Sequence, residues 1–201
     1  MKKLCFLFVT MLFCHLSLLA QVNVGVKAGI NINRIKYKKA DPEMASIGFQ
    51  AGLLAKIHVT DGFFVRPEVQ YSRKGYRFPA IGSDGQGNVR YHYVAVPILA
   101  GIPVGSKFSF LIGPEFGYLV KANSKFSTST RDVTQNFERF DWGLDLGGAW
   151  QITSSLGLEV RYNYGFYGLL KGVTTGQNGE ITGSNRDGAN RVIQAGLFYM
   201  L

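Results

Sequence analysis

The feature that most constrains the fold is a strict alternation of apolar and polar residues. In LGLEVRYNYGFYG, residues 156–168, Leu156 and Phe166 belong to one parity, whereas Glu159 and Arg161 belong to the other. Successive side chains of a β-strand point to opposite sides, so this segment predicts a strand with one apolar and one polar face. Two folds accommodate such a strand. The apolar face lines the core of a soluble sandwich or lipocalin-like barrel, but it meets lipid in an outer-membrane barrel.

The same period of two recurs along the chain and predicts eight strands. They cover residues 22–35, 47–58, 63–72, 91–102, 108–121, 140–152, 156–168 and 191–201. Short connections at 59–62, 103–107 and 153–155 alternate with long polar ones at 34–46, 73–90, 122–139 and 168–190. Membrane barrels have short periplasmic turns and longer external loops, whereas a soluble meander has no reason to separate loop lengths by side. The sequence therefore predicts an all-β fold, an eight-stranded antiparallel up-and-down transmembrane β-barrel with long external loops and short periplasmic turns.

The N-terminal segment predicts export. Lys2 and Lys3 precede an apolar run over residues 4–19, which is followed by the small residue Ala20. This order is typical of a cleaved secretory signal. A retained membrane anchor is the alternative, but the run is short for a spanning helix.

The domain division follows from that segment. We expect residues 1–20 to be a signal peptide and residues 21–201 to form one barrel domain in the cell outer membrane. Both cysteines, Cys5 and Cys14, lie in the signal. The mature chain therefore has no thiol for a disulfide, a metal site or catalysis.

Aromatic placement favours lipid over a soluble core. Trp142 and Trp150 share the apolar parity of one strand. Eight residues at about 3.3 Å, tilted by about 40°, separate them by roughly 20 Å along the membrane normal. Amphipathic rings prefer the two membrane interfaces. We expect the outer interface to hold Trp142, Tyr118, Tyr71 and Tyr164, and the inner one to hold Trp150, Phe63, Phe108 and Tyr199.

The polar parity carries charges of both signs. Pooled over the strands, the residues expected to point inward are Lys27, Lys56, Arg66, Lys121 and Arg161 together with Glu68, Glu115, Asp141, Asp145 and Glu159. Burying unpaired charge is costly, so these residues should form a hydrogen-bonded ion network centred on Arg66, Glu68, Glu159 and Arg161. An eight-stranded barrel is just wide enough to be filled by side chains. We interpret the network as a plug; a selectivity path for a solute is the alternative.

Three segments resemble a known family. VAVPILAGI at residues 94–102, FSFLIGPEFGYLV at 108–120 and LEVRYNYG at 158–165 are similar to strands of the PorT-like outer-membrane beta-barrel proteins. The resemblance covers essentially the mature chain, and its motifs are structural. It implies an outer-membrane location and an eight-stranded barrel. Some members are linked to a protein secretion system.

Motifs for chemistry are sparse. His58 and His92 fall at opposite ends of the predicted barrel, so no metal centre or cofactor is expected. His92 with a nearby serine is one arrangement for an acyl hydrolase, and an interfacial histidine among tyrosines is the simpler interpretation. The glycines of residues 82–88 suit a flexible polar loop. The basic cluster at residues 34–39 suits a solvated loop or contact with lipopolysaccharide phosphates.

The sequence thus favours a non-enzymatic outer-membrane barrel with a structural, adhesive or partner-docking role, including a secretion accessory. A small pore or transporter is the alternative, and a lipid-modifying enzyme is a weaker one. The expected partners are the lipid bilayer, with lipopolysaccharide and an envelope protein as further candidates. Nucleic acid is excluded by export.

Overall fold

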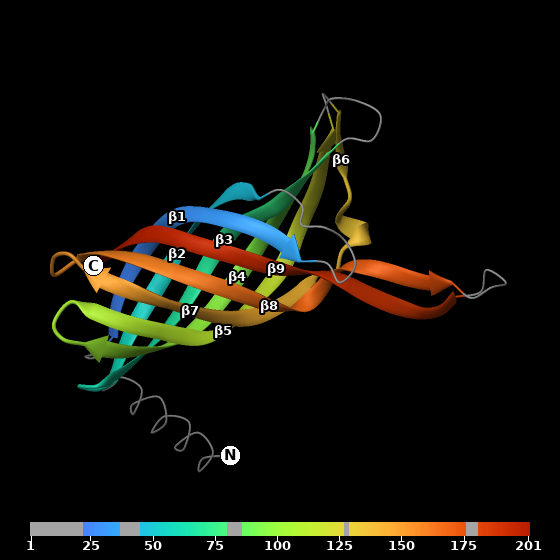
Figure 1. Ribbon diagram of the computed structural model, residues 1–201. Coiled ribbons are helices and arrows are strands. Elements are labelled where there is room, and N and C mark those ends of the chain that lie inside the picture. Colours follow the sequence, from blue (N-terminus) through green and yellow to red (C-terminus); the bar gives the residue numbers. More distant parts are fainter. Residues whose placement is uncertain (1–21, 37–44, 80–85, 127–128, 176–180) are drawn as a thin grey trace, which may run out of the picture.

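The computed structural model describes residues 22–36, 45–79, 86–126, 129–175 and 181–201, which form a closed antiparallel barrel (Figure 1). The elements are β1 (Val22–Lys36), β2 (Ser46–Thr60), β3 (Phe63–Pro79), β4 (Gln86–Val104), β5 (Phe108–Phe126), β6 (Ser129–Asp132), the short 3₁₀ helix η2 (Thr134–Asn136), β7 (Phe140–Gln151), β8 (Leu156–Thr175) and β9 (Ile181–Met200).

Eight of these strands make the barrel wall. Their order is β4-β3-β2-β1-β9-β8-β7-β5, and a β4–β5 pairing closes the sheet. The first and last strands also pair, β1 with β9. Within the described parts of the chain, β6 alone lies outside the wall, pairing with the far end of β5. The predicted eight-stranded antiparallel up-and-down barrel is therefore confirmed.

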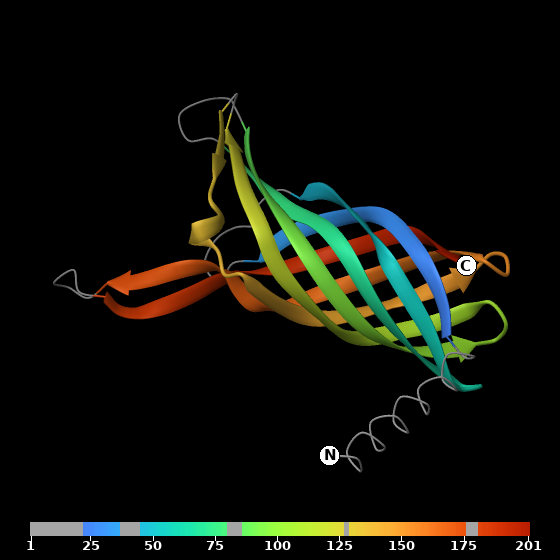
Figure 2. The same cartoon turned by 180° about the vertical axis from the view of Figure 1, so that it is seen from behind.

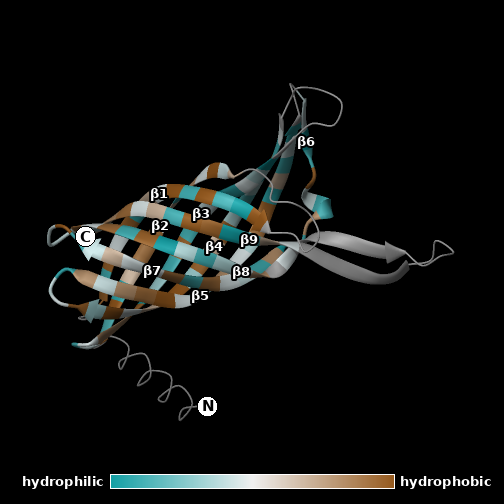
Figure 3. Cartoon of the chain, in the orientation of Figure 1, coloured by the Kyte–Doolittle hydropathy of each residue, from teal (hydrophilic) through white to brown (hydrophobic). Residues whose placement is uncertain are grey.

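The side-chain alternation runs inside out relative to a soluble protein. Val160 is 58% exposed on the outer surface, whereas the next residue, Arg161, is 1% exposed inside the barrel. Apolar residues form rows around the outside because paired residues on neighbouring strands share a face; Trp142 lies opposite Phe116. Apolar bands consequently alternate with polar ones along the strands in Figure 3. The apolar face of each strand is therefore the outer, lipid-facing face of the barrel.

Most of the long connections are themselves strands, which corrects their expected form. The predicted loops at 73–90, 122–139 and 168–190 largely belong to β3–β4, to β5–β6 and to β8–β9. Figures 1 and 2 show the β8–β9 hairpin projecting well beyond the barrel, with the β4–β5–β6 extension rising beside it. The buried face of the β3–β4 extension carries Tyr76 and Val89, but its other face carries Arg77 and Arg90, so the outward apolar residues that mark the predicted strands are missing there.

In the described residues, no helix has the length and apolar character needed to cross a membrane. The predicted signal peptide, residues 1–20, lies outside the described residues.

Candidate functional site

The barrel interior is crossed at mid-height by an ion network, here Lys27, Arg66, Glu68, Glu159, Arg161 and Asp145. Arg66 on β3 pairs with Glu159 on β8, and these two strands lie on opposite walls of the barrel. Lys27 on β1 bridges Glu68, at 2.9 Å, and Glu159. The network therefore spans the lumen.

Arg161 joins the carboxylates of three positions. Its Nη1 lies 3.1 Å from Glu68 and 3.5 Å from Asp145, and its Nη2 lies 3.5 Å from Glu159. Arg66 completes the set with an ion pair of 2.6 Å to Glu68. Each member is almost fully buried. Removing one partner from such a buried set typically costs about 3–5 kcal/mol, because an uncompensated charge remains.

A second charged group lies nearer the long-hairpin end. Lys74 pairs with Glu115 at 2.8 Å, and Gln70 Nε2 donates to the same carboxylate at 3.1 Å. Amides hold the two aspartates of β7: Asn163 donates to Asp145 at 2.6 Å, and Asn190 donates to Asp141 at 2.7 Å. Lys74 is not among the predicted interior residues, because the predicted third strand ends at residue 72.

A glycine makes room for the network. Gly147 on β7 lies opposite Arg161 on β8. A Cβ at Gly147 would lie 2.7 Å from Arg161 Cα and 2.8 Å from Arg161 Cγ. Carbons that are not bonded to each other do not approach this closely. A larger residue at position 147 would therefore force Arg161 to move from its position across the lumen. This close approach is one physical use of the chain's high glycine content, 25 residues.

An apolar layer lies in the lumen between the ion network and the short turns. We call it the inner apolar layer; its buried members are Leu54, Phe64, Leu99, Leu111, Ala149 and Phe198. The ring of Phe64 covers Gly101 on β4, and the ring of Phe198 covers Gly157 on β8. Each aromatic thus fills the space of a missing side chain on its neighbouring strand.

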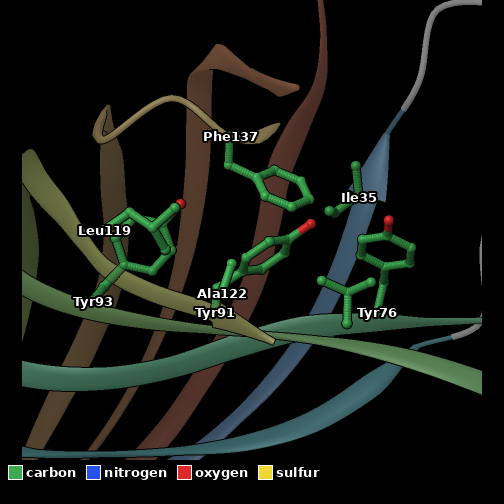
Figure 4. Close-up of a cluster of buried hydrophobic side chains, with 8 residues drawn as sticks. Ile35, Tyr76, Tyr91, Tyr93, Leu119, Ala122 and Phe137 are labelled. Carbon is green, nitrogen blue, oxygen red and sulfur yellow. The ribbon is translucent and has the colours of Figure 1, made fainter. Parts of the chain in front are cut away.

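A second apolar layer closes the other end. This outer apolar layer comprises Ile35, Tyr76, Val89, Tyr91, Tyr93, Leu119, Ala122 and Phe137. In Figure 4, Phe137 reaches into the layer from the segment that precedes β7. Its ring meets that of Tyr91 edge to face, with centroids 4.9 Å apart, and it is 4% exposed. A residue from an external connection therefore helps to seal the barrel.

The segment that carries Phe137, residues 129–139, is fixed to β5 by hydrogen bonds; we call it the cap segment. The Ala122 amide donates to Thr134 Oγ1, and the Val133 amide donates to the Ala122 carbonyl, both at 2.9 Å. Asp132 accepts from the Thr134 amide at 2.9 Å and from its hydroxyl at 2.6 Å. These hydrogen bonds lower the pKa of the Asp132 carboxyl.

Two lysines predicted for the interior network are placed elsewhere. Lys121 is exposed on the outer surface, because a bulge puts Tyr93 opposite Leu119 but the adjacent His92 opposite Lys121. The extra residue reverses the alternation, which sequence parity could not reveal. Lys56 is half-buried near the short turns, with its ammonium 4.4 Å from the centroid of the Phe64 ring. The other eight predicted members, Lys27, Arg66, Glu68, Glu115, Asp141, Asp145, Glu159 and Arg161, are buried in the lumen.

The predicted interface aromatics all lie on the outer surface. These are Trp142, Trp150, Tyr118, Tyr164 and Tyr199. Trp150 pairs with Leu158 near the short turns, and Trp142 pairs with Phe116 nearer the opposite end.

His58 and His92 lie at different levels of the barrel, opposite Phe64 and Arg73 respectively. His92 hydrogen-bonds Tyr71 through Nδ1 on the outer surface, and His58 lies near the short turns with its ring 6.2 Å from that of Phe64. Among the residues that the structure describes, no group of three His, Cys, Asp or Glu side chains could hold a metal ion.

A cavity of about 300 Å³ opens at the short-turn end. Lys56, Lys107 and members of the inner apolar layer line it, and Arg66 of the ion network also contributes to its lining. The solvent-accessible space at this end thus reaches the inner layer and the edge of the network.

An apolar outer surface around a filled polar lumen defines a small outer-membrane β-barrel protein. The chain belongs to the outer membrane protein beta-barrel domain family, whose model matches residues 19–171. Its location is the outer membrane. No curated protein sequence matches the chain significantly.

Solved structures share the fold at low sequence identity. Neisserial surface protein A (NspA) is 13% identical with a TM-score of 0.57, covering 89% of this chain and 97% of its own. Ail, the attachment invasion locus protein of Yersinia pestis, is 14% identical with a TM-score of 0.51, covering 90% and 99%. The structure of Ail in complex with the heparin analogue sucrose octasulfate is 13% identical with a TM-score of 0.52, and it covers 90% of this chain and 99% of its own.

Proposed function

We propose that this protein is a closed, non-enzymatic outer-membrane barrel that holds its strand extensions outside the cell as a rigid platform for adhesion or partner docking. The barrel is then an anchor and not a conduit.

The filling of the lumen carries this proposal. Two apolar layers enclose the ion network from either side, and the network itself joins opposite walls through Arg66 and Glu159. A solute would have to break buried ion pairs and displace packed aromatic rings to pass. Phe137 adds a seal from outside the wall.

The extensions support a docking role. β8 and β9 stay paired from Gly168 with Ala189 out to Thr175 with Ile181, so they form a continuous ribbon beyond the barrel. Paired strands hold their backbone in a fixed geometry, which lowers the ordering entropy lost on binding. Ail, which shares this fold, is described as an attachment invasion locus protein and was solved with a heparin analogue.

Planar-bilayer recordings test the closed lumen. We expect planar bilayers that contain the purified protein to show no sustained conductance steps. The folded state is verified by the different gel migration of unboiled and boiled samples. Sustained open steps from the folded protein would refute the plug and favour the small-pore alternative.

A shortened hairpin tests the platform. Joining Gly168 to Ala189 by a two-residue turn removes the β8–β9 extension at a register pair and leaves the wall intact. We expect this variant to insert normally but to lose adhesion to surfaces or cross-linking to envelope proteins on intact cells. The control is Ser154→Ala in an opposite short turn. Unchanged adhesion and cross-linking in the shortened variant would contradict the docking role.

The similarity of residues 94–102, 108–120 and 158–165 to PorT-like strands adds a finer proposal. The protein would then act as an accessory of a protein secretion system. Deleting the gene should lower the amount of secreted protein in the culture medium. An unchanged secretome would remove this assignment and leave the platform proposal standing.

A further inference from the structure

A patch of basic side chains covers the outer surface of three neighbouring strands where they leave the membrane. It consists of Arg73, Arg77, Arg90, Lys121 and Lys125, and we call it the basic patch. The strand register sets its geometry. Arg73, His92 and Lys121 make one cross-strand row over β3, β4 and β5, and Arg77, Asn88 and Lys125 make another.

Arg90 lies between these two rows. It pairs with Gly75 on one side and Asn123 on the other. Successive rows on one face are about 6.6 Å apart and neighbouring strands about 4.8 Å apart, so five cations share an area of roughly 13 Å by 10 Å. The nine positions of the three rows hold no carboxylate.

The bulge in β5 is what brings Lys121 to this face. Leu119 is fully buried inside the barrel, and regular alternation would put Lys121 there as well. The extra residue turns Lys121 outward, beside His92. The bulge thus removes a cation from the lumen and adds it to the patch. Bulges that re-aim a side chain in this way are recurrent at functional sites.

The first row begins directly beyond the outer aromatic residues. Tyr71, Val94 and Tyr118 form the cross-strand row two residues nearer the membrane. Arg73 lies over the lipid-facing ring of Phe49, with its guanidinium 4.8 Å from the centroid. The patch therefore faces sideways at the level of the lipid headgroups, where Lys and Arg are tolerated at about 0–1 kcal/mol.

Among the residues that the structure describes, few carboxylates lie on the adjoining elements. Asp132 on β6 pairs with Asn123, and its carboxylate already accepts two hydrogen bonds from Thr134. Glu138 belongs to the cap segment, and Arg139 beside it donates to the carbonyls of Leu119 and Val120. Within this described part of the chain, the patch and its neighbours carry more cations than carboxylates.

We propose that the basic patch binds the phosphate groups of an anionic glycolipid in the outer leaflet. The level and sideways orientation of the patch select this occupant, because neighbouring lipid headgroups lie against it whenever the barrel is in the membrane. Arginine forks suit phosphate oxygens, and the lysines add charge. This binding is independent of the platform role proposed above.

The test compares two double variants of the whole barrel in nanodiscs of neutral lipid. Arg73→Gln with Lys121→Gln removes two cations of the first row. Arg131→Gln with Lys107→Gln removes the same charge from β6 and from a short turn. The probes are bisphosphorylated lipid A and the same lipid A after enzymatic removal of both phosphates, titrated with native mass spectrometry as the readout.

At about 1 kcal/mol for each basic residue near the membrane surface, we expect the R73Q/K121Q pair to weaken binding of bisphosphorylated lipid A about 30-fold. The R131Q/K107Q control should bind as the wild type does. The charge-keeping pair Arg73→Lys with Lys121→Arg should retain most of the affinity, which separates loss of charge from loss of fold.

Three results would overturn the proposal. Equal affinity of the wild type for phosphorylated and dephosphorylated lipid A would show that phosphate is not recognised. Equal losses in both Gln pairs would show a general effect of net charge. Binding of soluble heparin through Arg73 and Lys121, with no binding of lipid A, would assign the patch to a soluble polyanion.

Discussion

Neutralising Glu159 tests whether the ion network holds the barrel together. Glu159 contacts Lys27, Arg66 and Arg161, all of them buried in the lumen. Glu159→Gln keeps the shape of the side chain and removes its charge, so three buried cations lose a shared partner. Leaving buried charge uncompensated costs about 3–5 kcal/mol, and we expect that decrease in the free energy of unfolding.

A double-mutant cycle sharpens the measurement. Arg66→Met in the Glu159→Gln background removes one of the cations left without its partner, so the two changes should cost less together than the sum of the single changes. The expected coupling energy lies at about 1–3 kcal/mol. Arg34→Gln, at an exposed position of β1, is the matched control and should stay within about 0.5 kcal/mol of the wild type.

The assay is denaturant unfolding in lipid vesicles, monitored by tryptophan fluorescence. Both tryptophans of the chain, Trp142 and Trp150, lie on the outer surface of β7 and should report loss of lipid contact. A Glu159→Gln cost below about 1 kcal/mol, or strict additivity with Arg66→Met, would show that the lumen charges are not mutually stabilising.

Three further predictions follow from the lumen and its cap. Gly147→Ala should destabilise the barrel by about 1–3 kcal/mol, because its Cβ would clash with the carbonyl oxygen of Val160 and with Arg161; unfolding unchanged within 0.5 kcal/mol would contradict this. Phe64→Ala should cost about 3–5 kcal/mol by leaving a void in the inner apolar layer, and a near-neutral result would show that this layer collapses without strain. The lowered pKa of Asp132 means that its contribution to the cap segment is present above the unfolded carboxyl pKa of about 3.9 and is lost as the pH falls through the lower folded value. The protection factor of the Ala122 amide, which donates to Thr134, should therefore fall at acid pH once the observed exchange rate is divided by the intrinsic rate at each pH, and Asp132→Asn should abolish that pH dependence.

The membrane-spanning part of the fold was predictable because lipid outside and charge inside impose one rhythm on every strand. The eight strands and the inward position of Glu159 and Arg161 follow from parity alone. The strand extensions were not predictable in this way. Beyond the membrane both faces of a strand can be polar, so the pattern predicts the end of the third strand at residue 72 and places Lys74 in a loop.

Other features of the interior depend on information that parity does not contain. The position of Lys121 depends on a bulge, and one extra residue reverses every side chain after it. The predicted fourth strand is apolar on both faces, so it carries inward apolar residues such as Leu99. These inward apolar residues are the sequence feature that indicates the apolar layers. Phe137 gave no such signal, because it reaches the outer layer from a connection distant from its neighbours in sequence.

Site-directed spin labelling at two adjacent positions tests the inside-out arrangement most directly. Val160 on β8 faces outward, and Gln194, one residue from its partner Ala195 on β9, faces into the lumen. With Cys5 and Cys14 both in the predicted signal peptide, a single introduced cysteine can be labelled cleanly in the mature chain. The label at Val160 should be relaxed strongly by oxygen, which dissolves in lipid, and weakly by a water-soluble nickel chelate, whereas the label at Gln194 should be shielded from both. A label at Val160 that meets the chelate, or one at Gln194 that meets lipid, would contradict the account.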